Sequence, residues 1–206
     1  MKRRLPLIFV AIVTVICVIG ASVAAVASGA SGSAVAYQVN ATKVSQATVD
    51  RELAEIADHD AVAKVETVFG IPVSATNGGI SSAFAATWLT VKIRQELFRQ
   101  AADAAKVSVD DAARAEQGRA LDQQFTNNNV NVRVSQLPPV VQHTLLDYFA
   151  YPKALGIDTQ AKLNSFFASA AKHASIRVDP RYGHWDRATL SVCPPTGCVP
   201  TTAAGG

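Results

Sequence analysis

Few side chains in this sequence have the types and spacing that bond chemistry requires. No His-Glu-x-x-His pair for a catalytic zinc, no Gly-x-Ser-x-Gly turn for a nucleophilic serine and no glycine-rich phosphate loop occurs. Two close pairs of carboxylates exist, but each lies where a helix is expected to begin or end, and a carboxylate at a helix start stabilises the helix dipole. We therefore assign no catalytic residue, no metal ligand and no cofactor. The side chains concerned are His59, His143, His173 and His184, with the pairs Asp58/Asp60 and Asp110/Asp111.

Two cysteines near the C-terminus enclose a turn-forming tetrapeptide. Cys193 and Cys198 flank Pro-Pro-Thr-Gly, and in an oxidising compartment they could close a small disulfide loop. Metal binding is the competing interpretation, but a zinc site needs four ligands and the nearest other candidate, His184, stands alone. Cys17 follows the bulky Ile16 within an apolar run, so we expect a small apolar residue there and no lipid attachment.

The N-terminal segment has the pattern of an export signal. Leu5 to Ala27 are 23 consecutive uncharged residues behind Lys2, Arg3 and Arg4, and a helix of that length spans about 34 Å, enough to cross a bilayer. Small-residue motifs at 25–27 and 34–36 would permit cleavage, so a cleaved signal peptide and an uncleaved anchor both stay open. Either alternative places the remainder outside the cytoplasm, as a secreted domain or one held at the cell membrane through residues 5–27.

Composition favours a packed domain and argues against nucleic acid as a partner. Hydrophobic residues make up 49% of the chain and charged residues 17%, which excludes a wholly disordered chain. The net charge of +3 comes from the N-terminal cluster, because residues 37–206 hold 16 basic and 16 acidic side chains. A protein that binds phosphate backbones needs a basic surplus on its working domain.

Apolar spacing of three and four residues predicts a mainly α-helical bundle of about five helices, residues 37–187, between an export segment at 1–36 and a flexible tail at 188–206. We expect short extended pieces around Asn40-Ala41 and at 175–178. Expected helix starts are Ser45 or Thr48, Ser81 or Ser82, Ser108 with Asp111 as a capping box, Pro138-Pro139, and Asp158. The expected ends are near residues 63–68, 106, 125, 151 (where Pro152 interrupts, with a short piece to Gly156) and 173.

The longest expected helix, residues 81–106, is apolar on two opposite faces. One face carries Phe84, Trp88, Val91 and Phe98, and the other carries Leu89, Ile93 and Leu97. Such a helix either lies sandwiched at the centre of the domain or lends one face to a partner.

Two segments of the chain resemble a known family. The opening Tyr37 to Leu53 and the stretch Val178 to Asp186, with its Pro-Arg-Tyr-Gly-x-Trp motif, resemble the SurA N-terminal-domain family of exported chaperones, which is related to the PrsA foldases and to the trigger-factor peptide-binding domain. The motif residues are Pro180, Arg181, Tyr182, Gly183 and Trp185.

The resemblance implies that residues 37–44 and 175–179 pair, and that the chain is an ATP-independent holdase for unfolded or extended exported polypeptides. Relatives that isomerise prolyl bonds use a separate parvulin domain, and by this resemblance we expect the chain to keep the client-binding part without the isomerase. A protein of this kind works by offering apolar and aromatic surface. A weakly active isomerase relative and a partner-specific, membrane-anchored structural protein are the alternatives. Candidate client-binding residues, which a helical core could equally require, are Phe84, Trp88, Val91, Phe98, Tyr148, Phe149, Phe166 and Phe167.

Overall fold

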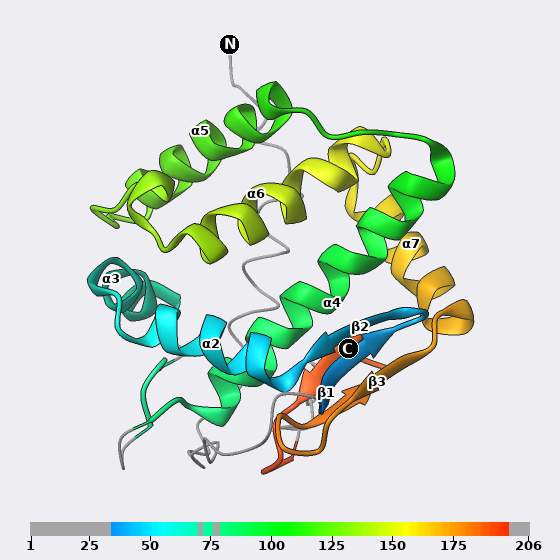
Figure 1. Ribbon diagram of the computed structural model, residues 1–206. Coiled ribbons are helices and arrows are strands. Elements are labelled where there is room, and N and C mark those ends of the chain that lie inside the picture. The colour runs from blue at the N-terminus through cyan, green and yellow to red at the C-terminus, as the bar shows by residue number, and fades with distance from the viewer. Residues whose placement is uncertain (1–33, 70–71, 76–78, 198–206) are drawn as a thin grey trace, which may run out of the picture.

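The computed structural model describes residues 34–69, 72–75 and 79–197 (Figure 1). The apolar segment 5–27, Cys17 and Cys198 lie outside these residues. Within the described part of the chain, none of the helices combines the length and the apolarity that crossing a bilayer requires. The described fold is mainly helical, as the sequence predicts.

A three-stranded sheet joins the two ends of the domain. Strands β1 (Val35–Val39) and β2 (Thr42–Ser45) form a hairpin, and β3 (Ile176–Val178) pairs with β1 in antiparallel fashion, so the order is β2-β1-β3. Tyr37 pairs with Val178, which confirms the pairing of the two ends. Asn40 forms the hairpin turn with a φ of 53°, a left-handed conformation that asparagine tolerates better than most residues.

The first expected helix is in fact two helices. Ser45 caps α2 (Gln46–Ala57) by accepting a hydrogen bond from the backbone N–H of Thr48, and Asp58 ends this helix. His59 then accepts a bond from the N–H of Ala61 at 3.3 Å, so that α3 (Asp60–Phe69) starts in a new direction. The break was not expected because the apolar spacing continues across it.

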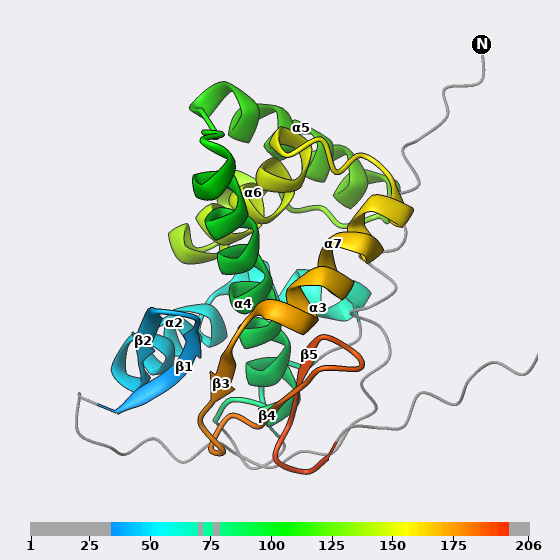
Figure 2. The same cartoon turned by 90° about the vertical axis from the view of Figure 1, so that its right-hand side faces the viewer.

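Helix α4 (Ser82–Ala105) is the central element, as its two apolar faces allow. Ser81 caps its start, and Lys106 ends it in a left-handed conformation. In Figure 2, α4 stands upright between the β1–β2 hairpin with α2 on one side and α7 with β5 on the other. Leu89 and Ile93 on one face are completely buried, and so is nearly all of Trp88 and Phe98 on the other. Of the two alternatives for this helix, the sandwiched position is confirmed.

The remaining helices are α5 (Asp111–Asn127), α6 (Pro139–Ala154) and α7 (Gln160–His173), with a 3-10 turn at Val134–Gln136 before α6. Two of the predicted helix N-caps are wrong: the first lies two residues before the observed cap, and the second lies one residue before it. Asp110, not Ser108, accepts the bond from the N–H of Ala113 at 2.7 Å, and Thr159, not Asp158, accepts from that of Lys162 at 3.2 Å.

Helix α6 runs through Pro152 without the expected interruption. A proline near the end of a helix removes one hydrogen bond but leaves the last turn to be held by packing, and Pro152 is buried. Gly156, with a φ of 70°, follows the helix end as expected.

The expected tail is partly folded. Strands β4 (His184–Asp186) and β5 (Ser191–Cys193) form a hairpin that packs on α4. Val192 and Cys193 are each only 1% exposed, and the N–H of Val192 donates to Thr90 Oγ1 at 2.8 Å. The domain therefore extends beyond residue 187, because these short β-prone residues bury themselves against α4 rather than remaining in solvent.

Candidate functional site

The predicted client-binding residues are largely core residues. On the described surface the one large hydrophobic side chain that is exposed is Val35, at 38%. The apolar face of α4 is therefore not an open binding surface, and Trp88 is additionally anchored by its Nε1–H, which donates to Glu52 Oε2 at 3.0 Å. The buried members of the set are Trp88, Phe98, Tyr148 and Phe167, and the half-buried members are Phe84, Val91, Phe149 and Phe166.

Four of these side chains form an aromatic cluster between α4, α6 and α7. The Phe98 ring lies 5.8 Å from that of Tyr148, 4.8 Å from that of Phe166 and 5.3 Å from that of Phe167, measured between centroids. Edge-to-face and offset rings at these distances are favourable in a core. We call Phe98, Tyr148, Phe166 and Phe167 the aromatic cluster.

A groove opens beside the aromatic cluster. It has a volume of about 430 Å³ and lies between α7, α4, α6 and the turn at 187–190 that joins β4 to β5. Figure 2 shows this turn close to α7. The apolar lining of the groove includes Leu163, Leu190 and two of the predicted residues, Tyr148 and Phe167. The aromatic cluster therefore contributes two of its rings to a hollow in the surface.

Two arginines line the same groove. The guanidinium of Arg94 lies 5.2 Å from the centre of the Phe167 ring, and it donates to the carbonyl oxygens of Leu190 at 3.0 Å and Thr189 at 3.4 Å. Arg187 is exposed at the turn. The described lining contains no Asp or Glu, so the groove combines apolar surface with positive charge.

The sequence did not predict that Arg94, Arg187 and Leu190 belong to this site. The apolar spacing of the last helix identifies Leu163 and Phe167, but Arg94 looks like a solvated residue on the flank of its helix. Arg187 and Leu190 lie at the edge of the expected domain and in the expected tail, where no periodicity signals structure. Leu190 also has a left-handed φ of 54°, which the sequence does not predict because leucine is not a residue typical of that conformation.

The side chains of the Pro-Arg-Tyr-Gly-x-Trp motif hold two segments of the fold together. The hydroxyl of the fully buried Tyr182 donates to Asp50 Oδ1 at 2.7 Å, and Arg181 Nη1 donates to Gln46 Oε1 at 3.2 Å. Burial, followed by the hydrogen bond to Asp50, raises the pKa of Tyr182 above its usual value. The motif thus fastens the chain after β3 onto the start of α2.

The other motif residues also make contacts within the fold. Gly183 has a φ of 128°, and a Cβ there would lie 1.9 Å from the carbonyl oxygen of Cys193. The carbonyl of Pro180 accepts from the N–H of Gly183 at 3.2 Å, and Trp185 packs half-buried on the core. The motif side chains therefore contact their own fold.

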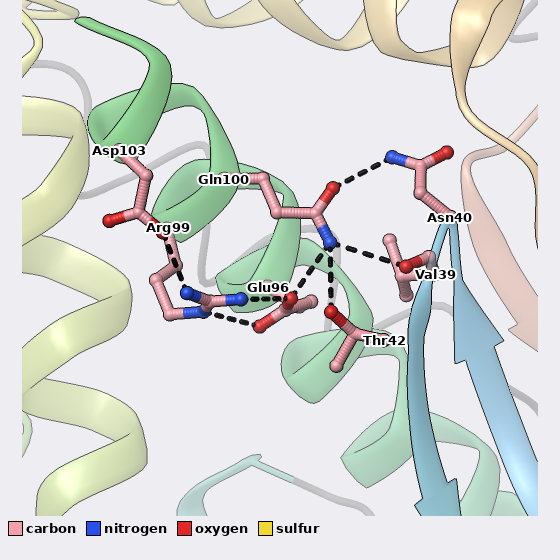
Figure 3. Close-up of polar contacts among 7 residues, drawn as sticks. All are labelled: Val39, Asn40, Thr42, Glu96, Arg99, Gln100 and Asp103. Atoms are coloured by element: carbon pink, nitrogen blue, oxygen red, sulfur yellow. Dashed lines mark hydrogen bonds and ion pairs between the residues drawn. The ribbon is translucent and has the colours of Figure 1, made fainter. Parts of the chain in front are cut away.

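A second polar network ties the β1–β2 turn to α4 (Figure 3). Asn40 Nδ2 donates to Gln100 Oε1 at 2.7 Å, and Gln100 Nε2 donates to Glu96 Oε1 at 2.8 Å. Arg99 forms an ion pair with Glu96 at 2.6 Å. Burial alone would raise the pKa of Glu96, but hydrogen bonds from Arg99, Gln100 and Thr42 outweigh it and hold that pKa below its usual value.

Among the candidates for redox or metal chemistry, His184 and Cys193 lie opposite each other in the β4–β5 pair. Cys193 is buried and disulfide-bonded; Cys198 lies outside the described residues, so the pairing of these two stays a prediction. Across residues 34–69, 72–75 and 79–197, no three side chains of the His, Cys, Asp or Glu type gather as a metal site would require. His143, His173 and His184 lie on α6, α7 and β4, and His59 lies between α2 and α3.

Comparisons with known proteins leave the family open. No family model, no curated protein and no solved structure matches the chain. The resemblance to the SurA N-terminal-domain family stays a prediction.

Proposed function

We propose that this chain is an extracytoplasmic, ATP-independent chaperone that binds short apolar segments of other exported polypeptides in the groove between α7 and the 187–190 turn. It performs no bond chemistry. The observation that carries the proposal is the groove itself, where Tyr148, Leu163 and Phe167 meet beside a hollow of about 430 Å³. Small-ligand sites have volumes of about 300–1,000 Å³ and a mostly apolar lining.

The size of the groove restricts the proposal. A holdase that coats long unfolded segments would need a broad apolar surface, and the described surface exposes only Val35 among its large hydrophobic side chains. We therefore propose recognition of a few consecutive residues, with the export segment 1–36 placing the domain outside the cytoplasm.

The scarcity of exposed apolar surface favours one alternative, a partner-specific structural protein held at the membrane. Such a protein would bind one folded partner and would not suppress aggregation of unrelated chains. A weak prolyl isomerase is a further alternative, and acceleration of prolyl isomerisation well above the uncatalysed rate would favour it.

Filling the groove tests the proposal. Ala168 is an exposed residue of α7 that lines the groove, and Ser165 is an exposed residue of the same helix outside its lining. Ala168→Trp should weaken the suppression of aggregation of reduced, unfolded α-lactalbumin, measured by light scattering. The apparent affinity should fall about tenfold or more, equivalent to a loss of about 1.4 kcal/mol.

Ser165→Trp is the matched control, because it adds the same ring to α7 away from the groove. Equal suppression by the two variants would contradict the proposed site. An absence of suppression by the unmodified chain would favour the partner-specific alternative.

A further inference from the structure

We infer that the groove selects the C-terminal end of a polypeptide, by holding an apolar last residue against its aromatic wall and the terminal carboxylate beside Arg94 and Arg187. The inference rests on the proposed function and names the part of a client that the groove takes. The juxtaposition that carries it is an apolar hollow with two cations and no described acid in its lining.

Arg94 is a preorganised but uncompensated cation. Its guanidinium stacks on the Phe167 ring, and its bonds to the Leu190 and Thr189 carbonyls fix its plane. Those bonds use two of the five N–H donors of an arginine, which leaves three for a ligand. Among the described residues, no carboxylate forms an ion pair with Arg94.

Asp186, the carboxylate nearest to Arg187 in the sequence, forms hydrogen bonds within the turn. Asp186 accepts hydrogen bonds from the N–H of Ala188 at 2.9 Å and from Thr189 Oγ1 at 2.8 Å, and so holds the turn. These bonds, from the backbone N–H first and the Thr189 hydroxyl second, lower the pKa of Asp186. In the described structure, Arg187 likewise forms no ion pair.

Charge complementarity therefore favours an anion on an apolar ligand. An arginine fork binds a carboxylate through two parallel hydrogen bonds, which are stronger than bonds between neutral groups. The end of a polypeptide places a carboxylate directly beside its last side chain, and a few residues suit a groove of about 430 Å³ better than a long passing segment. The occupant we commit to is accordingly an apolar C-terminus.

Peptides that differ only in their terminal group test this inference. The probes are N-terminally fluorescein-labelled Gly-Ser-Gly-Ala-Leu-Phe with a free carboxylate and the same peptide as its C-terminal amide. Binding to the full chain in phosphatidylcholine nanodiscs is followed by fluorescence anisotropy, with empty nanodiscs as the blank. We expect the acid to bind about tenfold more tightly than the amide.

Two arginine variants locate the effect. Arg187→Gln and Arg94→Gln should each reduce the preference for the acid, while Arg51→Gln, an exposed arginine of α2, should keep it. Since Arg94 also holds the 187–190 turn, Arg187→Gln is the variant whose folding is least at risk.

Three outcomes would overturn the inference. Equal binding of the acid and the amide would overturn it and leave the proposed function standing. The same holds if Gly-Asp-Gly-Ala-Leu-Phe amide, with an internal acid, binds as tightly as the free carboxylate. Binding of neither peptide would overturn both the inference and the groove as the site of the proposed function.

Discussion

At the scale of single residues, the side chains of the family-like motif act on the fold rather than on a substrate. Tyr182 and Arg181 bond the segment after β3 to α2, and Gly183 lets that segment pass directly against β5. Without the structure, a conspicuous tyrosine and arginine invite a functional interpretation. Their bonds to Asp50 and Gln46 indicate a structural one.

Gly183→Ala should strongly destabilise the domain. The new methyl group would lie 1.9 Å from the Cys193 carbonyl oxygen, at a φ of 128° that L-residues rarely adopt, so the β4–β5 hairpin must shift. We expect a loss of about 3 kcal/mol in the free energy of unfolding, measured by urea denaturation. Gly156→Ala is the control, because its φ is 70° but nothing lies within 4 Å, and it should cost only about 1–2 kcal/mol. Equal losses for the two variants would contradict the close approach.

At the scale of elements, the packing of the β1–β2 hairpin against α4 depends on a charge. Glu96 accepts from Arg99 and Gln100, and Gln100 in turn bonds Asn40 at the hairpin turn. A carboxyl group whose pKa is lowered by folding stabilises the fold above its unfolded pKa of about 4.3, and this stability is lost as the pH falls through the lower, folded value.

Glu96→Gln should therefore reduce the acid sensitivity of the domain. Thermal unfolding of both proteins at pH 7 and at successive pH values below about 4.3 should show a smaller decrease in melting temperature for the variant. Glu55→Gln, an exposed residue on α2, serves as the control and should retain the acid sensitivity of the unmodified chain. An unchanged acid profile for Glu96→Gln would show that this network does not hold the hairpin.

The sequence predicts elements well where periodicity and caps agree. Helix α4 begins and ends where Ser81 and Lys106 indicate, and its central position is one of the two alternatives that its two apolar faces predict. Prediction fails where a tertiary contact or a single local bond decides. His59 accepts a local bond from the N–H of Ala61 at the break, and α6 continues through a buried Pro152. The buried Val192 donates to Thr90, which is far away in the sequence.

At the scale of the whole molecule, the two ends of the domain meet and close it. Strand β3 pairs with β1, and the β4–β5 hairpin covers α4, so little apolar surface remains exposed. Most of the aromatic side chains that could have bound a client are used to hold α4, α6 and α7 together. The groove could not be predicted, because it forms between α7 and a turn that the sequence places in a tail.

The most direct test of the central claim, that a client segment occupies this groove, is amide hydrogen exchange of the full chain in nanodiscs with and without reduced, unfolded α-lactalbumin. We expect slower exchange at residues 160–171 and 187–190 when the client is present, and unchanged exchange in α5, which does not line the groove. Client-dependent protection confined to α5, or none in α7 and the 187–190 turn, would contradict it.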